Sequence, residues 1–283
     1  MDEFLKMLET ALEIFEVGQS PQTFLVLIGL GFARVLSFLV IVPFFGGAIV
    51  PGRVKVATAA ALVIIAYPAL AAGVTPESAL SFGAVGFIAL LTKEVFVGFT
   101  LGFVATLVFE AIQVAGRIID LQRGSSMSEM FAPQLQTRVS ELGQFKLQFA
   151  IMLFLLIGAH QPFLSGLIHS FEILPALGFP RLTPGWTPLL ASIVMLSGGV
   201  LAIGVQLAAP AMIALLLTDL FFGIINRVAP QINVFFLSLP VKMVIGLLVV
   251  LLALPLYKER YIHYFGETLR AFQELLRALS GAS

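Results

Sequence analysis

Six long apolar runs, separated by short polar or turn-forming stretches, dominate the chain. They lie at 23–50, 54–74, 79–110, 145–175, 186–224 and 231–257. A helix crosses the hydrocarbon core of a bilayer with about 20 mostly apolar residues. The apolarity within each run is continuous and does not alternate, which favours helices over the strands of a membrane barrel. The pattern therefore predicts an all-α integral membrane protein.

Two of these runs are unusual. Run 186–224 is longer than one span, and glycines and a proline interrupt it: Gly198, Gly199, Gly204 and Pro210. We therefore expect a kinked or broken helix there. Run 79–110 carries Lys93 and Glu94 near its middle. It is expected to form either two short helices or one helix with a buried polar patch.

Both ends of the chain differ from the hydrophobic body at 23–257. Residues 1–22 are acidic and amphipathic, unlike the basic start of a secretory signal. Residues 258–283 predict an amphipathic C-terminal helix. Its apolar stripe consists of Ile262, Phe265, Leu269, Phe272, Leu276 and Leu279. We expect this helix to lie on a membrane or on a partner without spanning.

Composition supports a membrane protein and excludes several classes of function. The 283 residues are 59% hydrophobic and 11% charged, against about 45–50% and about 25% in soluble domains. Lys+Arg and Asp+Glu both number 16, so no basic excess supports nucleic-acid binding. Cysteine is absent and the three histidines lack metal-ligand spacing. No Walker loop, GxSxG elbow or HExxH pair occurs, so we expect neither an enzyme nor a cofactor or metal.

Charged and amide side chains interrupt the apolar runs. Insertion of an ionisable group costs about 2.5–3.5 kcal/mol, so such groups usually face protein or an aqueous cavity. We predict that they line a subunit interface or a channel; pairing within the chain, or snorkelling of Arg34 from a helix end, is the alternative. The candidates are Arg34, Lys93, Glu94, Glu110, Asp120, Arg123, Asp219, Asn226, Arg227 and Lys242.

Spacing adds two expectations for these residues. Lys93 and Glu94 are adjacent and point differently on a helix, so each is expected to pair with another element and not with its neighbour. Asp219 and Asn226 are two helical turns apart and therefore share a face. They predict a polar stripe against a partner helix.

Three stretches resemble the FliR/SctT family. "KEVFVGFTLGFVATLVFEAIQVAGRIIDLQRGSSMSEMFAP" (Lys93–Pro133) resembles the middle of the family, and "LTDLFFGIINRVAPQINVFFLSLPVK" (Leu217–Lys242) resembles its C-terminal signature. "ARVLSFLVIVPFFGGAIVPGRVKVA" (Ala33–Ala57) is similar to its early arginine, paired prolines and basic turn. The resemblance covers about residues 24–257. The "LQRG" at Leu121–Gly124 favours the injectisome branch over the flagellar branch.

The resemblance implies a core subunit of the type III protein export apparatus. Such a subunit is a multi-pass protein of the bacterial inner membrane. It assembles with FliP/SctR-like and FliQ/SctS-like subunits into a channel for unfolded proteins, joined by an FlhB/SctU-like switch protein. The family is built of kinked helical hairpins that stand partly above the bilayer, so hydropathy overcounts the true spans. It needs no cofactor.

The resemblance also gives a hypothesis for the polar stretch Gly116–Pro133. It is interpreted as a turn between two hairpin helices at a subunit or channel-facing position, with an ordinary solvated loop as the alternative. Met127 and Met130 are flexible apolar side chains that could help to seal a closed pore. A secondary transporter is the rival function; it predicts a chain that is complete alone or as a homo-oligomer.

Overall fold

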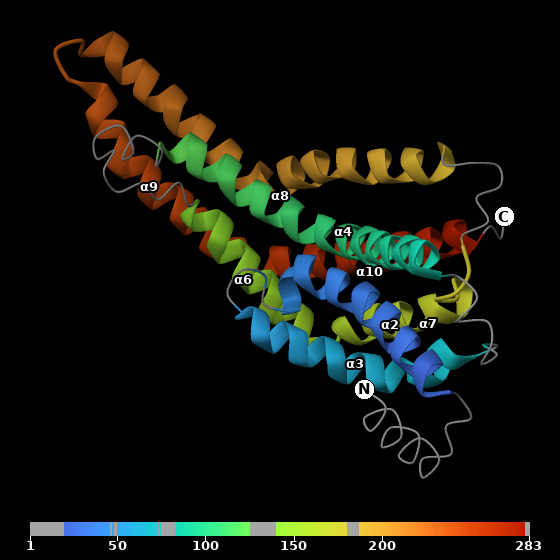
Figure 1. Cartoon of the computed structure of the whole chain (residues 1–283). Coiled ribbons are helices and arrows are strands. Elements are labelled where there is room, and N and C mark those ends of the chain that lie inside the picture. Colours follow the sequence, from blue (N-terminus) through green and yellow to red (C-terminus); the bar gives the residue numbers. More distant parts are fainter. Residues whose placement is uncertain are drawn as a thin grey trace. The chain divides into compact units, whose positions relative to one another are not determined.

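The computed structural model describes residues 20–45, 47, 50–72, 74, 83–124, 140–179 and 187–280. In these ranges every regular element is a helix (Figure 1). The helices are α2 (Pro21–Ile41), η1 (Pro43–Phe45), α3 (Gly52–Ala71), α4 (Gly83–Arg123), α6 (Glu141–Leu156), α7 (His160–Ile173), α8 (Thr187–Val228), α9 (Val234–Leu252) and α10 (Leu254–Ser280). The all-α prediction is confirmed. Met127, Met130 and residues 1–19 of the predicted N-terminal segment lie outside the described residues.

Within the described ranges, five helices are long and apolar enough to cross a membrane. They are α2, α3, α4, the part of α8 from Ala191 to Val228, and α9. A sixth span results if the interrupted pair α6 and α7 is counted together. The lengths and composition confirm a multi-pass membrane protein.

Helix α4 corrects two expectations. Residues 83–110 of run 79–110 belong to one helix of 41 residues, so the expectation of two short helices is wrong and the single helix with a buried polar patch is right. The helix also continues through the first part of the predicted turn Gly116–Pro133. It ends at Arg123, and Gly124 follows with a φ of 78° that favours glycine. The carboxylate of Asp120 is paired with Arg123 and hydrogen-bonded to Ser140 and Leu142 within the chain, which favours continuation of the helix.

Two other runs are divided differently from the prediction. Run 145–175 forms two helices, separated at residues 157–159, where Gly158 has a φ of 72°. Residues 187–224 of run 186–224 belong to one helix, α8, with Pro210 inside it. Figure 1 shows that α8 changes direction between its gold first part and its orange second part. The expected kink is therefore present, without a break in the helix.

The chain folds as two compact units, each made of separate segments. Unit 1 consists of Met1–Thr106, His160–Ile193 and Leu269–Ser283, and unit 2 of Leu107–Ala159 and Val194–Thr268. Helices α4, α8 and α10 each contribute residues to both units.

Aromatic side chains form the core of each unit. In unit 1 the Phe272 ring lies 6.4 Å from Phe38 and 5.3 Å from Phe163, centroid to centroid. In unit 2 the Phe265 ring lies 5.0 Å from Phe154 and 5.6 Å from Phe109. All six side chains are buried. Edge and tilted ring pairs of this kind stabilise a core beyond simple burial.

Helix α10 supplies part of both cores, which corrects the prediction for the C-terminal segment. Phe265, Phe272 and Leu276 of the predicted stripe are 3%, 0% and 4% exposed. Four of the six stripe residues are thus buried by the chain itself, whereas Ile262 is 40% exposed and Leu269 is half-buried. The expectation that the whole stripe faces a membrane or a partner is therefore wrong. Each such side chain gains about 1.5–3 kcal/mol by burial in the core.

Candidate functional site

The first cluster of predicted residues lies inside unit 1. Arg34 on α2 and Glu94 on α4 form a bidentate pair: Nε donates to Oε2 at 2.5 Å and Nη2 to Oε1 at 2.9 Å. Both side chains are 0% exposed. Parallel charge-assisted bonds of this geometry are the strong ones in proteins. With Lys93, these residues form what we call the ion cluster.

Arg34 also binds the C-terminal end of α7. Its Nη1 donates to the carbonyl of Ser170 at 2.8 Å, and its Nη2 to the carbonyl of Leu174 at 2.8 Å. Its guanidinium lies 4.2 Å from the centroid of the Phe171 ring. The carbonyls in the last turn of a helix carry partial negative charge, so a cation placed there is favourable. One cation therefore joins α2, α4 and α7.

Lys93 binds the segment that follows α7. Its Nζ donates to the carbonyls of Pro175 at 3.0 Å, Ala176 at 2.8 Å and Gly178 at 2.8 Å. Its Nζ also lies 2.6 Å from Oε1 of Glu94. The expectation that Lys93 and Glu94 do not pair is therefore wrong. The long lysine stem lets the ammonium reach the neighbouring carboxylate, which serves two cations at once.

Close backbone packing brings the ion cluster together. A Cβ on Gly98, one turn after Glu94 on α4, would lie 2.1 Å from the carbonyl oxygen of Arg34. Helices α2 and α4 therefore touch at a position that only glycine fits. This contact holds the carboxylate beside the guanidinium.

The second cluster lies in unit 2, where α4 ends and α6 begins. The Asp120 carboxylate accepts from Nη2 of Arg123 at 2.5 Å, from the hydroxyl of Ser140 at 2.5 Å and from the amide of Leu142 at 2.9 Å. Ser140 is the N-cap of α6 and accepts from the amide of Gly143. Asp120 and Ser140 together satisfy two amides of the first turn of α6. We call Asp120, Arg123 and Ser140 the turn cluster.

Three glycines make room for the turn cluster. A Cβ on Gly116 would lie 2.3 Å from Cα of Gly143, so the backbones of α4 and α6 are in contact. A Cβ on Gly246 of α9 would lie 2.3 Å from Cδ of Arg123. The aliphatic part of the Arg123 side chain therefore packs against the backbone of α9, which adds a third helix to the cluster.

The remaining predicted residues lie near the surface of unit 2. Glu110 is exposed. Asp219 forms an ion pair with Lys242, which joins α8 to α9; their side chains are 49% and 15% exposed. Asn226 and Arg227 are exposed near the end of α8. Of the charged and amide residues predicted from the sequence, the structure thus groups five into the ion and turn clusters and pairs Asp219 with Lys242. Glu110, Asn226 and Arg227 belong to neither cluster.

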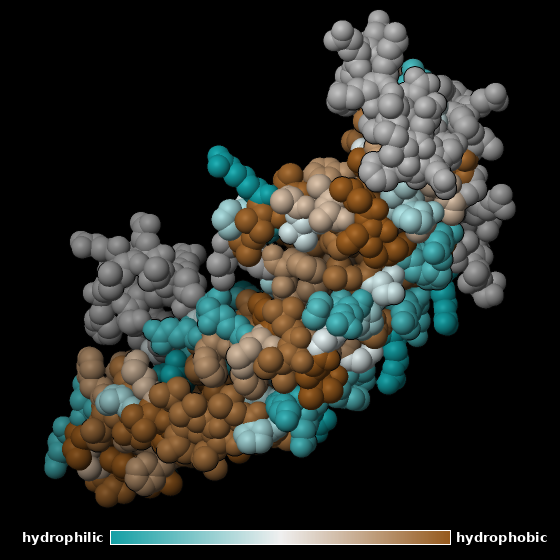
Figure 2. All heavy atoms as spheres, turned by 90° about the horizontal axis from the view of Figure 1, so that it is seen from below, coloured by the Kyte–Doolittle hydropathy of each residue, from teal (hydrophilic) through white to brown (hydrophobic). Residues whose placement is uncertain are grey.

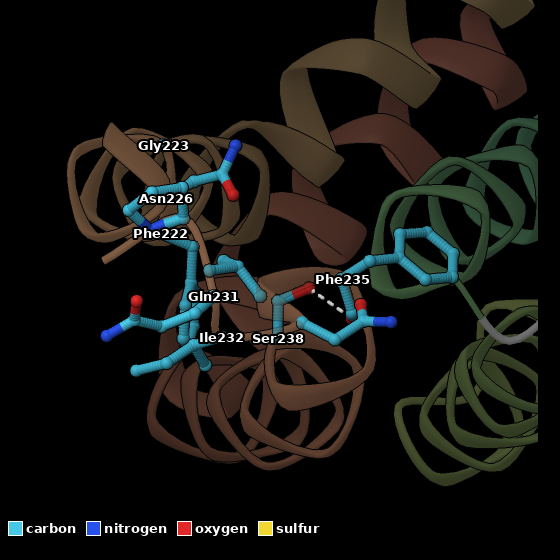
Figure 3. A pocket seen from close by; sticks show the side chains of 10 residues that line it. Phe222, Gly223, Asn226, Gln231, Ile232, Phe235 and Ser238 are labelled. Atoms are coloured by element: carbon cyan, nitrogen blue, oxygen red, sulfur yellow. Dashed lines mark hydrogen bonds between the residues drawn. The ribbon is translucent and has the colours of Figure 1, made fainter. Parts of the chain in front are cut away.

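Asn226 lines a pocket where α8 and α9 meet. Figure 3 shows Phe222, Gly223 and Asn226 from α8, and Phe235 and Ser238 from α9, around it. The pocket has a volume of about 500 Å³ and an uncharged lining. Its chemistry suits neutral polar or apolar groups.

Large apolar side chains remain exposed on α8 and α9. Examples on α8 are Ile213, Leu216, Leu217, Leu220 and Phe221, which are 57–60% exposed; those on α9 are Phe236, Val244, Leu247, Leu248 and Leu252. Figure 2 shows wide brown areas of hydrophobic residues on one side of the molecule. A surface of this kind contacts lipid or another protein.

Sequence reasoning missed Lys146 of α6. Its side chain is 1% exposed. It is the only lysine or arginine in run 145–175. A single cation in an apolar run is the feature of the sequence that could have identified it as a buried charge. Because it lies one residue from the start of that run, it was not distinguished from a cation at the exposed end of a helix.

The comparisons with known proteins give the family. Residues 25–268 match the model of "Bacterial export proteins, family 1". The chain belongs to this family. It is 31% identical over 252 residues to the flagellar biosynthetic protein FliR of Pectobacterium carotovorum, which covers 89% of this chain and 93% of that protein. It is 33% identical over 226 residues to the surface presentation of antigens protein SpaR of Salmonella typhimurium, which covers 79% and 81%.

Relatives of both branches of this FliR/SctT family match. The FliR protein of Aquifex aeolicus is 28% identical over 92% of this chain and 97% of its own length. The Yop proteins translocation protein T of Yersinia pestis is 33% identical over 68% of this chain and 71% of its own length. The chain is therefore a multi-pass membrane protein and a type III export-apparatus subunit.

Proposed function

We propose that this chain is the FliR/SctT subunit of the type III export gate in the bacterial inner membrane. It assembles with FliP/SctR-like and FliQ/SctS-like subunits, and with an FlhB/SctU-like switch protein, around a channel for unfolded proteins. It works as a structural subunit, without catalysis and without a cofactor.

The observation that carries this proposal is the exposed apolar surface of α8 and α9. Only 28% of the apolar window of α8 and 22% of that of α9 is buried within the chain. The charges of the ion cluster and the turn cluster are already satisfied within the chain. The apolar faces are the surfaces that still need cover, and partner subunits supply it together with lipid.

The exposed polar residues of these two helices are the best candidates for contacts with neighbours or the channel. Asp219, Asn226 and Arg227 lie among exposed apolar side chains. A polar group in such a surface is favourable only opposite a polar partner or water. Lys242 joins this set through its pair with Asp219.

The other predicted residues take different places in the proposal. Arg34, Lys93 and Glu94, like Asp120 and Arg123, are buried and hold helices in position behind the interface. For these, for Glu110, and for the sealing role of Met127 and Met130, the assignment to an interface or channel stays a prediction.

Native mass spectrometry in mild detergent tests the proposal. The chain is expressed alone and then together with its FliP/SctR-like and FliQ/SctS-like neighbours. We expect a stable hetero-complex that contains this chain, and poor behaviour of the chain alone. A well-behaved monomer or homo-oligomer that ignores these proteins would contradict the proposal and favour a transporter.

A matched pair of variants sharpens this test. Leu248→Arg places a charge on the exposed face of α9, where the residue is 50% exposed. Glu267→Arg places the same charge on the polar face of α10, where the side chain is 49% exposed. We expect the first variant to lose the hetero-complex and the second to keep it. Equal effects of the two would show that the α9 face is not an interface.

The injectisome branch stays a prediction from "LQRG" at Leu121–Gly124. Complementation of a flagellar FliR deletion tests it. Restored motility would contradict the injectisome assignment.

A further inference from the structure

Lys146 is a buried cation without a carboxylate partner. Among the residues that the structure describes, no carboxylate oxygen lies within 4.0 Å of its Nζ. The ammonium lies 3.9 Å from the centroid of the Tyr257 ring on α10 and donates to the carbonyl of Leu207 on α8 at 3.4 Å. Removing an ammonium from water is costly unless it is paired and hydrogen-bonded. Packing alone would be served better by an apolar side chain.

The carbonyl that Lys146 contacts lies beside a defect in α8. Pro210 has no N–H, so it cannot donate to the carbonyl of Gln206, four residues earlier, and its ring pushes that carbonyl aside. Leu207 is the next residue. The ammonium therefore contacts the carbonyl next to the one that has lost its amide donor.

Two other helices hold the same turn of α8. The side-chain oxygen of Gln206 accepts from the hydroxyl of Tyr264 on α10 at 2.8 Å. A Cβ on Gly204 would lie 2.8 Å from Cγ1 of Val114 on α4. Residues 204–207 are therefore held by α4, α6 and α10, all within unit 2.

Beyond Pro210, α8 continues toward α9 with one buried and one exposed apolar face. Ile213, Leu216 and Leu220 are 57–60% exposed, and the helix continues into the turn that leads to α9. Figure 1 shows that α8 changes direction along its length. Residues 204–207 before Pro210 are held by three neighbouring helices, and the part of α8 after Pro210 leads into the hairpin with α9, although exposed apolar side chains such as Leu201 occur before Pro210 as well.

We propose that Lys146 is a positioning residue: its ammonium holds the α8 backbone at the turn before Pro210 and so sets the direction of the α8–α9 hairpin. The consequence for assembly rests on the proposed function, because the hairpin carries the faces that partner subunits cover. The effect on hairpin direction is a property of this chain alone.

Distances between spin labels in the purified chain test this proposal. The chain has no cysteine, so labelled cysteines are unique. One pair, Arg117→Cys with Ile224→Cys, joins α4 to α8 beyond Pro210; both positions are exposed. The control pair, Arg117→Cys with Leu201→Cys, joins α4 to α8 before Pro210. All three positions belong to unit 2.

Lys146→Met removes the charge and keeps the length of the side chain. We expect it to shift or broaden the 117–224 distance and to leave the 117–201 distance unchanged. Lys146→Arg, which still donates to the carbonyl, should keep both distances. In a Pro210→Ala chain, residue 210 can donate its N–H to the carbonyl of Gln206, so α8 has no missing hydrogen bond. Adding Lys146→Met to that chain should therefore not shift the 117–224 distance further.

Two results would overturn the proposal. Unchanged distances for both pairs would show that Lys146 does not position the hairpin, and equal shifts in both would show a general loosening. If Lys146→Met does not fold, Lys146→Leu is judged by the same two distances. Native mass spectrometry gives the second readout: Lys146→Met should lower the yield of hetero-complex, with recovery in Lys146→Arg. If the unaltered chain forms no hetero-complex, the proposed function fails while the distance test still decides the role of Lys146.

Discussion

Glu94 is the residue on which the interior of unit 1 depends most. Its carboxylate is 0% exposed and faces the cations of both Arg34 and Lys93. Removing one partner of a buried pair leaves an uncompensated charge, at a cost of about 3–5 kcal/mol. The free energy of unfolding of this unit is therefore sensitive to this one side chain.

We predict that Glu94→Gln lowers the free energy of unfolding by about 3–5 kcal/mol. Thermal unfolding in detergent measures the loss. Glu267→Gln on the exposed face of α10 is the control and should stay within about 0.5 kcal/mol. A Glu94→Gln chain as stable as this control would show that the ion cluster adds nothing to stability.

A second prediction at this scale concerns Tyr257 on α10, which is not among the candidate spans. Burial raises the pKa of Tyr257 from 10.0 to about 12, and raises the pKa of Tyr261 as well. The unfolded chain therefore loses phenol protons above about pH 10, while the folded chain keeps that of Tyr257 to about pH 12. The free energy of unfolding must then fall as the pH rises through this window.

Thermal unfolding at about pH 9 and about pH 11.5 measures this fall. Tyr257→Phe has no phenol to ionise and should lose less stability between the two values than the unaltered chain. Parallel losses in both proteins would refute the role of Tyr257.

The sequence marked the charged residues but not their partners. Arg34 and Glu94 are 60 positions apart, and no local pattern connects residues at that distance. Lys146 was missed because one cation near the start of an apolar run resembles a helix end. The glycines that pack beside each cluster could not be identified from the sequence, since a close approach of two backbones depends on which helix lies next to the glycine.

At the scale of elements, helix contacts depend on where glycine allows the backbones to meet. We predict that Gly116→Ala lowers the free energy of unfolding by about 1–3 kcal/mol, because a Cβ there meets the backbone of Gly143 at 2.3 Å. Gly198→Ala on α8 is the matched control, with no atom within 4 Å of its Cβ. It should be neutral or stabilise the helix by up to about 1 kcal/mol. Equal thermal unfolding of the two variants would contradict the close contact of α4 and α6.

Apolar periodicity predicted which segments are helices better than it predicted where they end. A helix that is apolar on all sides shows no change of pattern at its boundary, so α4 was expected to end near 110 and ends at Arg123. Its polar end is helical because Asp120, Arg123 and Ser140 satisfy one another. The stripe of α10 predicted a helix correctly. The same stripe fits a membrane, a partner or the core of its own chain, so the sequence could not decide among them.

At the scale of the whole molecule, α10 limits how the chain sits in a bilayer. Its outer face exposes Lys258, Glu259, Arg260, Glu267, Arg270, Glu274 and Arg277. A face with alternating charges is stable in water and costly in hydrocarbon. We therefore propose that α10 and the helices beside it stand at least partly outside the bilayer, so that fewer helices cross it than hydropathy indicates.

Labelling of single cysteines tests this proposal. Lys258→Cys and Glu274→Cys are about 24 Å apart along the helix. We predict that a membrane-impermeant maleimide labels both from the same side of the membrane. Labelling from opposite sides would show that α10 crosses the bilayer.

The central claim is that other export subunits cover the apolar faces of α8 and α9, and photo-crosslinking in cells tests it most directly. A photoreactive amino acid replaces Leu248 on the exposed face of α9, and, as a control, Glu274 on the polar face of α10. We predict a light-dependent adduct at 248 with a FliP/SctR-like or FliQ/SctS-like subunit, identified by mass spectrometry, and none at 274. Adducts of 248 with lipid alone, or with a second copy of this chain alone, would contradict the claim.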